Sequence, residues 1–309
     1  MDIIKAFINA LEEINKFHSR YVLKQLKALN QSEKDCFINL VNYFIYKGYD
    51  INFIVSSYNS MVKDSIIHQR YFVNHNDYMY HSFEEVNKAI YDNPDKMQEY
   101  LIGLSISHYL WNNHVTLNRY FTEKFNAFVG ADKYIKNHYL EVGPGYGESF
   151  LYALNNSNFL FYEGIDISST SVKNSNDYIQ YNLSLVNNLE KSSLYKIVKQ
   201  DFYDYDTHKK VDAFICSEVL EHIENPHLFL TKIADITHKD SFIYLTTAIN
   251  APSSGHIYLF RNADEVFKMV NRAGLIVDDY ICADNSDTAG NASHTNRPIL
   301  IAMILKNNN

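Results

Sequence analysis

The sequence predicts an α/β fold with a doubly wound sheet, preceded by an all-helical segment. Residues 1–130 carry apolar side chains at helical spacing, whereas from residue 131 onward short β-rich runs alternate with helical ones. The last two β-rich runs are separated only by a short polar loop, residues 284–297, which is unsuited to a crossover helix. We therefore expect two domains, at residues 1–130 and 131–309, which is an ordinary division for a chain of 309 residues.

Local signals mark the helix ends in the first part. Apolar residues at 37–45 follow helical spacing, and Lys47-Gly48 ends that helix. Asp50 can cap the next one, and Ser82-Phe83-Glu84-Glu85 forms a capping box for a short helix. Pro94 suits the first turn of a long helical stretch. One face of that stretch carries Leu101, Leu104, His108 and Trp111.

The second part contains seven candidate strands. The first five alternate with helices, as in a parallel sheet, and the last two are expected to lie antiparallel at its edge. The sequence therefore predicts a seven-stranded sheet whose last strand is antiparallel. The candidate strands are 139–142, 159–165, 195–199, 211–216, 241–246, 276–283 and 298–305.

Composition excludes some classes of protein. The net charge of −8 and the lack of a dense basic run argue against a large nucleic-acid interface. No apolar run reaches the roughly 18 residues that a membrane span needs, and the N-terminus does not resemble a signal peptide. Cys36, Cys216 and Cys282 are far apart in apolar runs, which predicts reduced, buried thiols. We expect a cytoplasmic protein.

Glycines and acids at strand ends predict a nucleotide site. Gly143, Gly145 and Gly147 follow Glu141 and the first strand, where bare backbone lets a ligand lie against the chain. Asp166 ends the second strand about 20 residues later, where a carboxylate can accept both ribose hydroxyls.

Two further strand ends complete this set of sites. Asp201 and Phe202 follow the third strand and are suited to bind the adenine amino group and cover its ring. Ser217 ends the fourth strand. All four sites lie at carboxyl ends of parallel strands, the edge at which open α/β sheets bind ligands.

These motifs resemble those of class I S-adenosylmethionine (SAM)-dependent methyltransferases over residues 131 to 305. The segment 141–147 resembles the family's first motif, and Asp166 with Ile167, then Asp201-Phe202, resemble its ribose-side and adenine-side motifs. The segment 217–226 is similar to the EVLEH segment of many small-molecule and quinone O-methyltransferases. The resemblance implies SAM as cofactor, and the alternating glycine spacing favours SAM over a nicotinamide.

The catalytic candidates are His222, His256 and Glu218. Either histidine is suited to act as general base or substrate ligand. Our preferred interpretation has no metal and puts Glu218 beside the methionine moiety of SAM. In the alternative, Glu218, Glu221, His222 and His256 bind a divalent metal, as the similar segments of small-RNA 3′-end and some quinone O-methyltransferases imply.

Aromatic and polar side chains of the helical segment are candidates for a substrate pocket beneath a helical lid. The alternatives are that they form the core between helices, or that the segment is a dimerisation surface. The candidate lining residues are Tyr71, Tyr78, His108, Trp111 and His114, together with Asn250 after the fifth strand.

The predicted function is SAM-dependent methyl transfer to a small-molecule metabolite, at oxygen, nitrogen or carbon. One alternative keeps SAM but cyclises or transfers its aminocarboxypropyl chain, which releases methylthioadenosine. Another is a non-catalytic SAM-binding protein. The acidic net charge and the bulky helical segment favour a small, enclosed substrate over nucleic acid.

Overall fold

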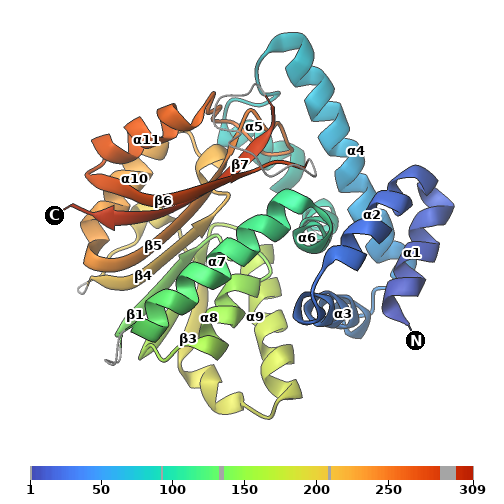
Figure 1. Cartoon of the computed structure of the whole chain (residues 1–309), viewed down its shortest axis with the longest axis horizontal. Helices are drawn as coiled ribbons and strands as arrows, with labels where there is room; N and C mark the ends of the chain where they lie inside the picture. The colour runs from blue at the N-terminus through green and yellow to red at the C-terminus, as the bar shows by residue number, and fades with distance from the viewer. Residues whose placement is uncertain (1, 92, 132–135, 208–209, 286–296, 309) are drawn as a thin grey trace.

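The protein consists of a mixed sheet with helices on both faces and a group of N-terminal helices at one side (Figure 1). This computed structural model describes residues 2–91, 93–131, 136–207, 210–285 and 297–308. The two chain ends lie on opposite sides of the molecule, the N-terminus with helices α1 and α2 (Ile3–Ile14 and Lys16–Ala28) and the C-terminus at the sheet.

The sheet has seven strands in the order β3-β2-β1-β4-β5-β7-β6. Strands β1 to β5 pair in parallel, and β7 runs antiparallel to both β5 and β6. The predicted fold class is therefore confirmed. The strands are β1 (His138–Val142), β2 (Phe161–Asp166), β3 (Tyr195–Lys199), β4 (Val211–Ser217), β5 (Thr237–Ile249), β6 (Leu275–Ala283) and β7 (Ile299–Asn307).

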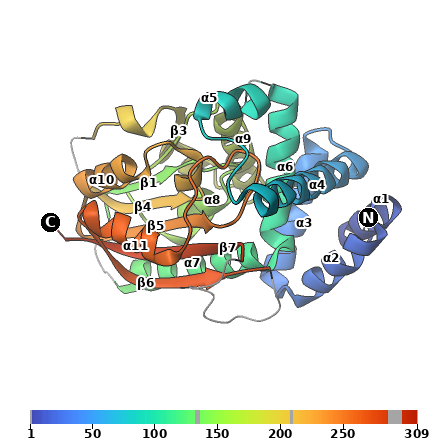
Figure 2. The same ribbon diagram turned by 90° about the horizontal axis from the view of Figure 1, so that it is seen from above.

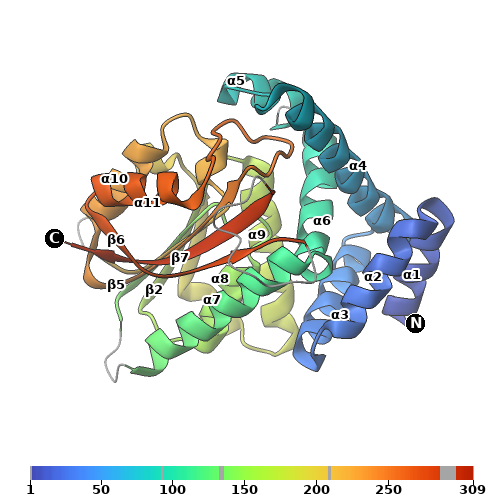
Figure 3. The same ribbon diagram turned by 45° about the horizontal axis from the view of Figure 1, so that its top comes forward.

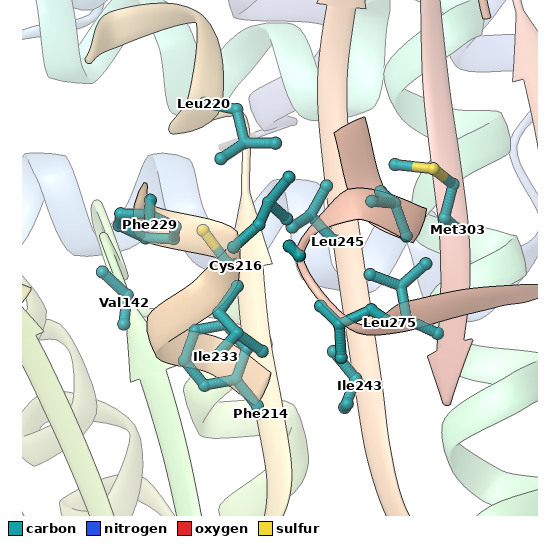
Figure 4. Packing of buried hydrophobic residues seen from close by; sticks show 14 of the residues in the cluster. Val142, Phe214, Cys216, Leu220, Phe229, Ile233, Ile243, Leu245, Leu275 and Met303 are labelled. Carbon is teal, nitrogen blue, oxygen red and sulfur yellow. The ribbon is translucent and has the colours of Figure 1, made fainter. Parts of the chain in front are cut away.

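Helices cover both faces of this sheet because alternate side chains of each strand point to opposite faces. Helices α10 (Pro226–Ile236) and α11 (Ala263–Arg272) pack on one face, where Figure 4 shows Phe229 and Ile233 of α10 beside the strand residues. Phe214 and Cys216 of β4 face them, while Ala213 and Ile215 belong to the core on the other face. That second core is closed by α7 (Asn112–Ala131), α8 (Glu148–Asn156) and α9 (Ser169–Leu185).

The N-terminal helices form their own core on the α8 and α9 side of the sheet. Figure 2 shows α4 and α6 side by side, and Figure 3 shows α6 between α4 and the sheet. Tyr146 and Tyr178 of the α/β part belong to the same buried cluster as these helices. The helices not yet placed are α3 (Gln31–Tyr46), α4 (Ile51–His75), α5 (Phe83–Val86), the π-helical turn η1 (Asn87–Tyr91) and α6 (Pro94–Leu110).

Helix ends follow the predicted signals in most places. Asp50 accepts a hydrogen bond from the backbone N–H of Phe53 at 2.8 Å, and Pro94 begins α6. Ser82 caps α5, but the carboxylate of Glu85 accepts from the N–H of His81 and not from that of Ser82, so only half of the predicted capping box forms. The α6 helix ends at Leu110, and Trp111 is its C-cap with an extended backbone. Of the residues predicted to share one helix face, Leu101, Leu104 and His108 therefore lie in the helix and Trp111 lies just beyond it.

The cysteines correct one expectation from the sequence. Cys36 is exposed, Cys282 is half-buried and only Cys216 is buried, so an apolar neighbourhood in sequence did not mean burial at all three. Cys36 follows from its place on α3, because the helix buries Phe37 and Leu40 and leaves the adjoining face to solvent. Among the described residues no helix is long and apolar enough to cross a membrane.

Two contacts attach the segment from Asn76 to Phe83, which joins α4 to α5, to the α/β part. The guanidinium of Arg261, which precedes α11, donates to the carbonyl and side-chain oxygens of Asn76 at 2.9 and 3.0 Å. The backbone N–H of Phe83 donates to Glu224 Oε1 at 3.0 Å. The segment therefore covers the loops that follow β4 and β5.

The crossing of α4 and α6 leads to a stability prediction. A Cβ at Gly103 of α6 would lie 2.8 Å from the carbonyl oxygen of Ser57 and 3.0 Å from Cβ of Met61, both on α4. We expect Gly103→Ala to lower the free energy of unfolding by about 1–3 kcal/mol, because the two helices must move apart. The matched control is Gly130→Ala in α7, where a Cβ meets nothing within 4 Å. Denaturant titration should show the control unchanged or more stable by up to about 1 kcal/mol. A gain in stability at both positions would contradict the prediction.

Candidate active site

A cavity of about 1800 Å³ lies at the carboxyl ends of the strands, under the N-terminal helices. Its lining includes the turn after β1, the ends of β2 and β4, and residues of α4 and α6. Pockets for a single small ligand usually measure about 300–1,000 Å³, so this cavity has room for two ligands. Its nucleotide side includes Gly143 and Asp166, and its helical side includes Met61 and Leu101.

The glycine turn after β1 has the backbone shape that the sequence predicts. Gly143, Gly145 and Gly147 all have positive φ angles, of 71°, 56° and 83°. A Cβ at Gly143 would also approach Cγ2 of Val219 to 2.8 Å. Gly143 and Gly145 line the cavity, whereas Gly147 lies behind it as the left-handed N-cap of α8. Bare backbone therefore faces the cavity at this turn.

Two acidic side chains lie beside this turn, and burial raises the pKa of each toward neutrality. Burial raises the pKa of Asp166 to about 6, although backbone N–H groups, including that of Ser168 at 2.7 Å, favour its charged form. Burial also raises the pKa of Glu141 to about 7, against a hydrogen bond from the hydroxyl of Tyr139 at 2.5 Å. Both side chains line the cavity, so both are available to a ligand.

The other predicted nucleotide residues also line the cavity. Asp201 accepts from the N–H of Tyr203 at 2.8 Å and is exposed, while Phe202 is buried against Phe229 with ring centroids 4.4 Å apart. Ile167 and Ser217 contribute from the ends of β2 and β4. The structure thus brings together the four strand ends that the sequence analysis predicted to form one site.

Three candidate catalytic or metal-binding side chains converge after β4 and β5. Single ligand atoms of Glu221, His222 and His256 all lie within 4.8 Å of one another. His222 Nδ1 lies 2.9 Å from the carbonyl of Gly255, and His256 Nδ1 lies 2.7 Å from that of Ala251. A carbonyl oxygen only accepts, so both Nδ1 atoms carry the proton and each neutral ring has a lone pair at Nε2.

The electrostatics of this cluster favour neutral imidazoles and an unsatisfied acid. Burial lowers the pKa of His222 to about 4 and that of His256 well below its ordinary value, where the neighbouring His222 adds to the effect. Burial and the charge of Glu218 raise the pKa of Glu221 to about 8. Thr247 donates to Glu221 Oε2 at 2.8 Å, but Oε1 is buried with no hydrogen-bond partner among the described residues. An orphaned carboxylate oxygen beside two imidazole lone pairs is a donor set that fits a divalent transition-metal ion.

A second group of titratable side chains lies nearer the glycine turn. His108 of α6 pairs with Glu148, the first residue of α8, at 2.7 Å. Nε2 of His114 lies 3.8 Å from Oε1 of Glu218. Glu218 has a left-handed backbone (φ 54°), a costly conformation for a residue with a side chain, and it lines the cavity.

The predicted substrate residues divide into two sets. His108, Trp111 and His114 line the cavity. Tyr71, Tyr78 and Asn250 are absent from its lining: Tyr78 is buried edge-on against His256, and Asn250 donates to the carbonyl of Arg261 at 2.7 Å.

Sequence reasoning assigned no role to Glu148. Its only sequence signal is an acid directly after the glycine turn, and its partner His108 lies 40 residues earlier in the chain. Only the packing of α6 against the start of α8 brings the two together.

A sheet of this strand order, with a glycine turn after β1 and an acid at the end of β2, defines the class I SAM-dependent methyltransferase fold. The chain belongs to the family described as "Methyltransferase domain", whose sequence profile matches residues 115–277.

Relatives and solved structures agree with this family. The chain is 25% identical over 109 residues to "Ubiquinone biosynthesis O-methyltransferase, mitochondrial" of Dictyostelium discoideum, covering 35% of this chain and 34% of the relative. It is 31% identical over 62 residues to "Ubiquinone biosynthesis O-methyltransferase" of Glaesserella parasuis serovar 5 (strain SH0165), covering 20% and 26%. The matches thus span about a third or less of these relatives. The structure of mitomycin 7-O-methyltransferase MmcR is similar in fold, with a TM-score of 0.52 and 12% identity over 84% of this chain and 70% of that one.

Proposed function

We propose that this protein transfers the methyl group of SAM to a hydroxyl of a small-molecule acceptor. The observation that carries the proposal is one cavity that joins a nucleotide side, at the strand ends, to an acceptor side under α4 and α6. Two neutral imidazoles, His222 and His256, lie at this cavity. Oxygen as the attacked atom is favoured because both sequence relatives are named O-methyltransferases.

In this proposal SAM lies along the strand ends. Asp166 accepts hydrogen bonds from the ribose hydroxyls, Asp201 and Phe202 hold the adenine, and the methionine end lies against Gly143 and Gly145. The positive φ angles at these glycines support this arrangement, because side chains there would be strained. The sulfonium then points toward the acceptor side of the cavity.

The reaction is an in-line displacement at the methyl carbon. The acceptor oxygen forms a bond to the methyl group as the carbon–sulfur bond breaks, and S-adenosylhomocysteine (SAH) leaves. The hydroxyl proton must go to a base, and the Nε2 lone pairs of His222 and His256 are suited to accept it. Alignment supplies the rest of the rate enhancement, since the sulfonium is already activated.

The same cluster is our candidate for a divalent metal. Glu221, His222 and His256 would hold it through the orphaned oxygen and the two Nε2 atoms. A bound ion would orient the acceptor hydroxyl and lower its pKa. Glu218, the fourth residue of the predicted set, stands outside this group of converging ligand atoms among the described residues.

We further propose that the N-terminal helices before α7 act as a lid that encloses the acceptor. Met61 and Val62 of α4 and Leu101 and Leu104 of α6 line the cavity, which favours an acceptor with an apolar body. The contacts of Asn76 with Arg261 and of Phe83 with Glu224 support a closed arrangement. In this proposal Tyr71 does not contact the acceptor and is simply a residue of α4, one of the lid helices.

Product analysis tests the function. Purified protein is incubated with SAM and a panel of phenolic, catecholic and amine acceptors, and the sulfur-containing product is identified by mass spectrometry. We expect SAH together with an acceptor that has gained 14 mass units. Methylthioadenosine as the product would replace methyl transfer with cyclisation or aminocarboxypropyl transfer. SAM that binds but stays unconverted with every acceptor would favour the non-catalytic alternative.

A further inference from the structure

A chain of three hydrogen-bonding side chains lies where α2 reaches the cavity. Nε1–H of Trp111, at the end of α6, donates to the hydroxyl oxygen of Tyr58 on α4 at 3.1 Å. The same hydroxyl lies 2.8 Å from Nε2 of His18 on α2. Tyr58 is fully buried, whereas His18 and Trp111 line the cavity. The chain thus joins three helices at one wall of the cavity, and the methyl-transfer step proposed above does not use it.

The chain fixes which nitrogen of His18 carries the proton. An indole nitrogen can only donate, so the oxygen of Tyr58 accepts from Trp111. The buried hydroxyl proton of Tyr58 then needs an acceptor of its own, and among the described residues only Nε2 of His18 lies within reach. Burial lowers the pKa of His18, which favours the neutral ring. The single ring proton of His18 is therefore at Nδ1.

The Nδ1–H group of His18 is a donor that remains for a ligand. The rings of Tyr21 and Tyr58 both stack on His18 with ring centroids 5.6 Å apart, so contact with a ligand is left to the ring edge. Nδ1 has no hydrogen-bond partner in the part of the chain that the structure describes. A neutral N–H donor is matched by a neutral oxygen that only accepts, such as a carbonyl oxygen.

This donor lies far from the imidazoles that serve the reaction. Nε2 of His68 on α4 lies 3.3 Å from Oγ of Ser254, which is two residues before His256. Tyr58 and His68 are ten residues apart on α4, so the two ends of the cavity are separated by about 15 Å along this helix. An acceptor that reaches both ends is therefore elongated, with an apolar middle. The wall between the ends includes Met61, Val62, Leu101 and Leu104.

We propose that His18 determines acceptor specificity: its Nδ1–H donates to a carbonyl oxygen at one end of an elongated acceptor, whose other end carries the reacting hydroxyl beside His222 and His256. Tyr58 and Trp111 are positioning residues, because they hold the ring proton of His18 at Nδ1. This inference rests on the proposed function, since it takes the hydroxyl-bearing acceptor from it.

Ligand pairs of graded length test the proposal without turnover. Each ligand is a catechol with an unbranched alkyl chain that ends either in a methyl ketone or in an isopropenyl group, which has the same shape but no oxygen. Binding to the SAH-saturated protein is measured by calorimetry. We expect the ketone to bind at least threefold more tightly than its matched alkene where the chain separates the two ends by about 15 Å. Ligands with the shortest chains should show no such preference.

Variants assign this ketone preference to His18. His18→Leu should abolish it while the affinity for SAH stays within twofold, and His18→Asn should keep part of it through the amide N–H. Tyr58→Phe should reduce the preference, because nothing then fixes the ring proton at Nδ1. The matched control is His75→Leu, which replaces an exposed histidine of α4 that is bonded to the carbonyl of Tyr71 and lies outside the cavity lining. It should keep the full preference.

The possible failures separate the inference from the proposed function. Equal binding of ketone and alkene at every chain length in the wild type would overturn the inference and leave methyl transfer untouched. A full ketone preference in His18→Leu, with unchanged melting, would also overturn it, as would a wild type that binds SAH but no catechol of any length. Failure of the folded wild type to bind SAH would instead overturn the proposed function.

Discussion

Asp166→Ala is expected to weaken SAH and SAM binding at least tenfold, which is about 1.4 kcal/mol. Asp166 lies at the end of β2, lines the cavity and accepts from the N–H of Ser168 at 2.7 Å, and its two carboxylate oxygens have further lone pairs for ribose hydroxyls. Hydrogen bonds to a charged group contribute about 1.5–3 kcal/mol each, so loss of the carboxylate should exceed the tenfold limit. Calorimetric titration with SAH measures the effect. The control is Asp177→Ala, which removes a half-buried acid of α9 paired with Lys47 and Lys173, outside the cavity lining.

The pH dependence of ligand affinity tests whether the charged carboxylate of Asp166 is the group that binds the ribose. The pKa of Asp166 is raised to about 6 by burial, and ribose hydroxyls donate to its charged form. Affinity should therefore be full above pH 7 and fall as the pH drops through 6, by about tenfold at pH 5. Methylthioadenosine is the suitable ligand, because it has no charged amino-acid end. Asp166→Asn should lack this fall, and an unchanged affinity in Asp166→Ala would remove Asp166 from the site.

His256→Ala is expected to lower kcat by about 10²- to 10⁴-fold while SAM affinity stays within threefold. His256 is buried with Nδ1–H on the carbonyl of Ala251, which presents its Nε2 to the cavity beside His222. The residue serves as base or as metal ligand in our proposal, and either role affects the chemical step more than cofactor binding. Steady-state kinetics combined with SAH titration separates the two quantities. The control is His238→Ala. His238 lies at the start of β5, where it pairs with Asp212.

Metal content distinguishes the two roles of this cluster. If Glu221, His222 and His256 bind an ion, elemental analysis of the purified protein should find a divalent metal that His256→Ala lacks. Excess chelator should then abolish activity, and addition of Zn²⁺, Mn²⁺ or Fe²⁺ should restore it. Retained activity in excess chelator would exclude the metal and leave His256 as a base. Full activity of His256→Ala would contradict both roles.

Patterns that depend on neighbouring residues in the chain were predicted well. The seven strands, the antiparallel last strand and the helix starts at Asp50 and Pro94 all follow from periodicity, glycine and capping signals. The nucleotide side of the cavity was also predictable, because the carboxyl ends of parallel strands meet at one edge. Gly143, Asp166 and Asp201 therefore line one cavity although they are far apart in sequence.

Tertiary packing decided which candidate residues of the helical segment line the cavity. Spacing shows which side chains share a helix face but not what that face meets, so Tyr71, Tyr78 and His108 looked equivalent as candidates. In the structure His108 meets Glu148, Tyr78 is buried against His256, and Tyr71 is not part of the cavity lining. The same reasoning explains Cys36, which lies among apolar residues in sequence and on an exposed face of α3.

By itself, then, the sequence determined the fold class, with seven strands and an antiparallel last strand, and the nucleotide end of the cavity, because these follow from local backbone preferences and from parallel strand connections. Tertiary structure alone decided in which direction the pKa of each imidazole moves. The contact with Glu148 outweighs burial and raises the pKa of His108, while burial lowers the pKa values of His114, His222 and His256. A charge depends on the solvent and partners around a side chain, and those are assembled only when helices distant in sequence pack together.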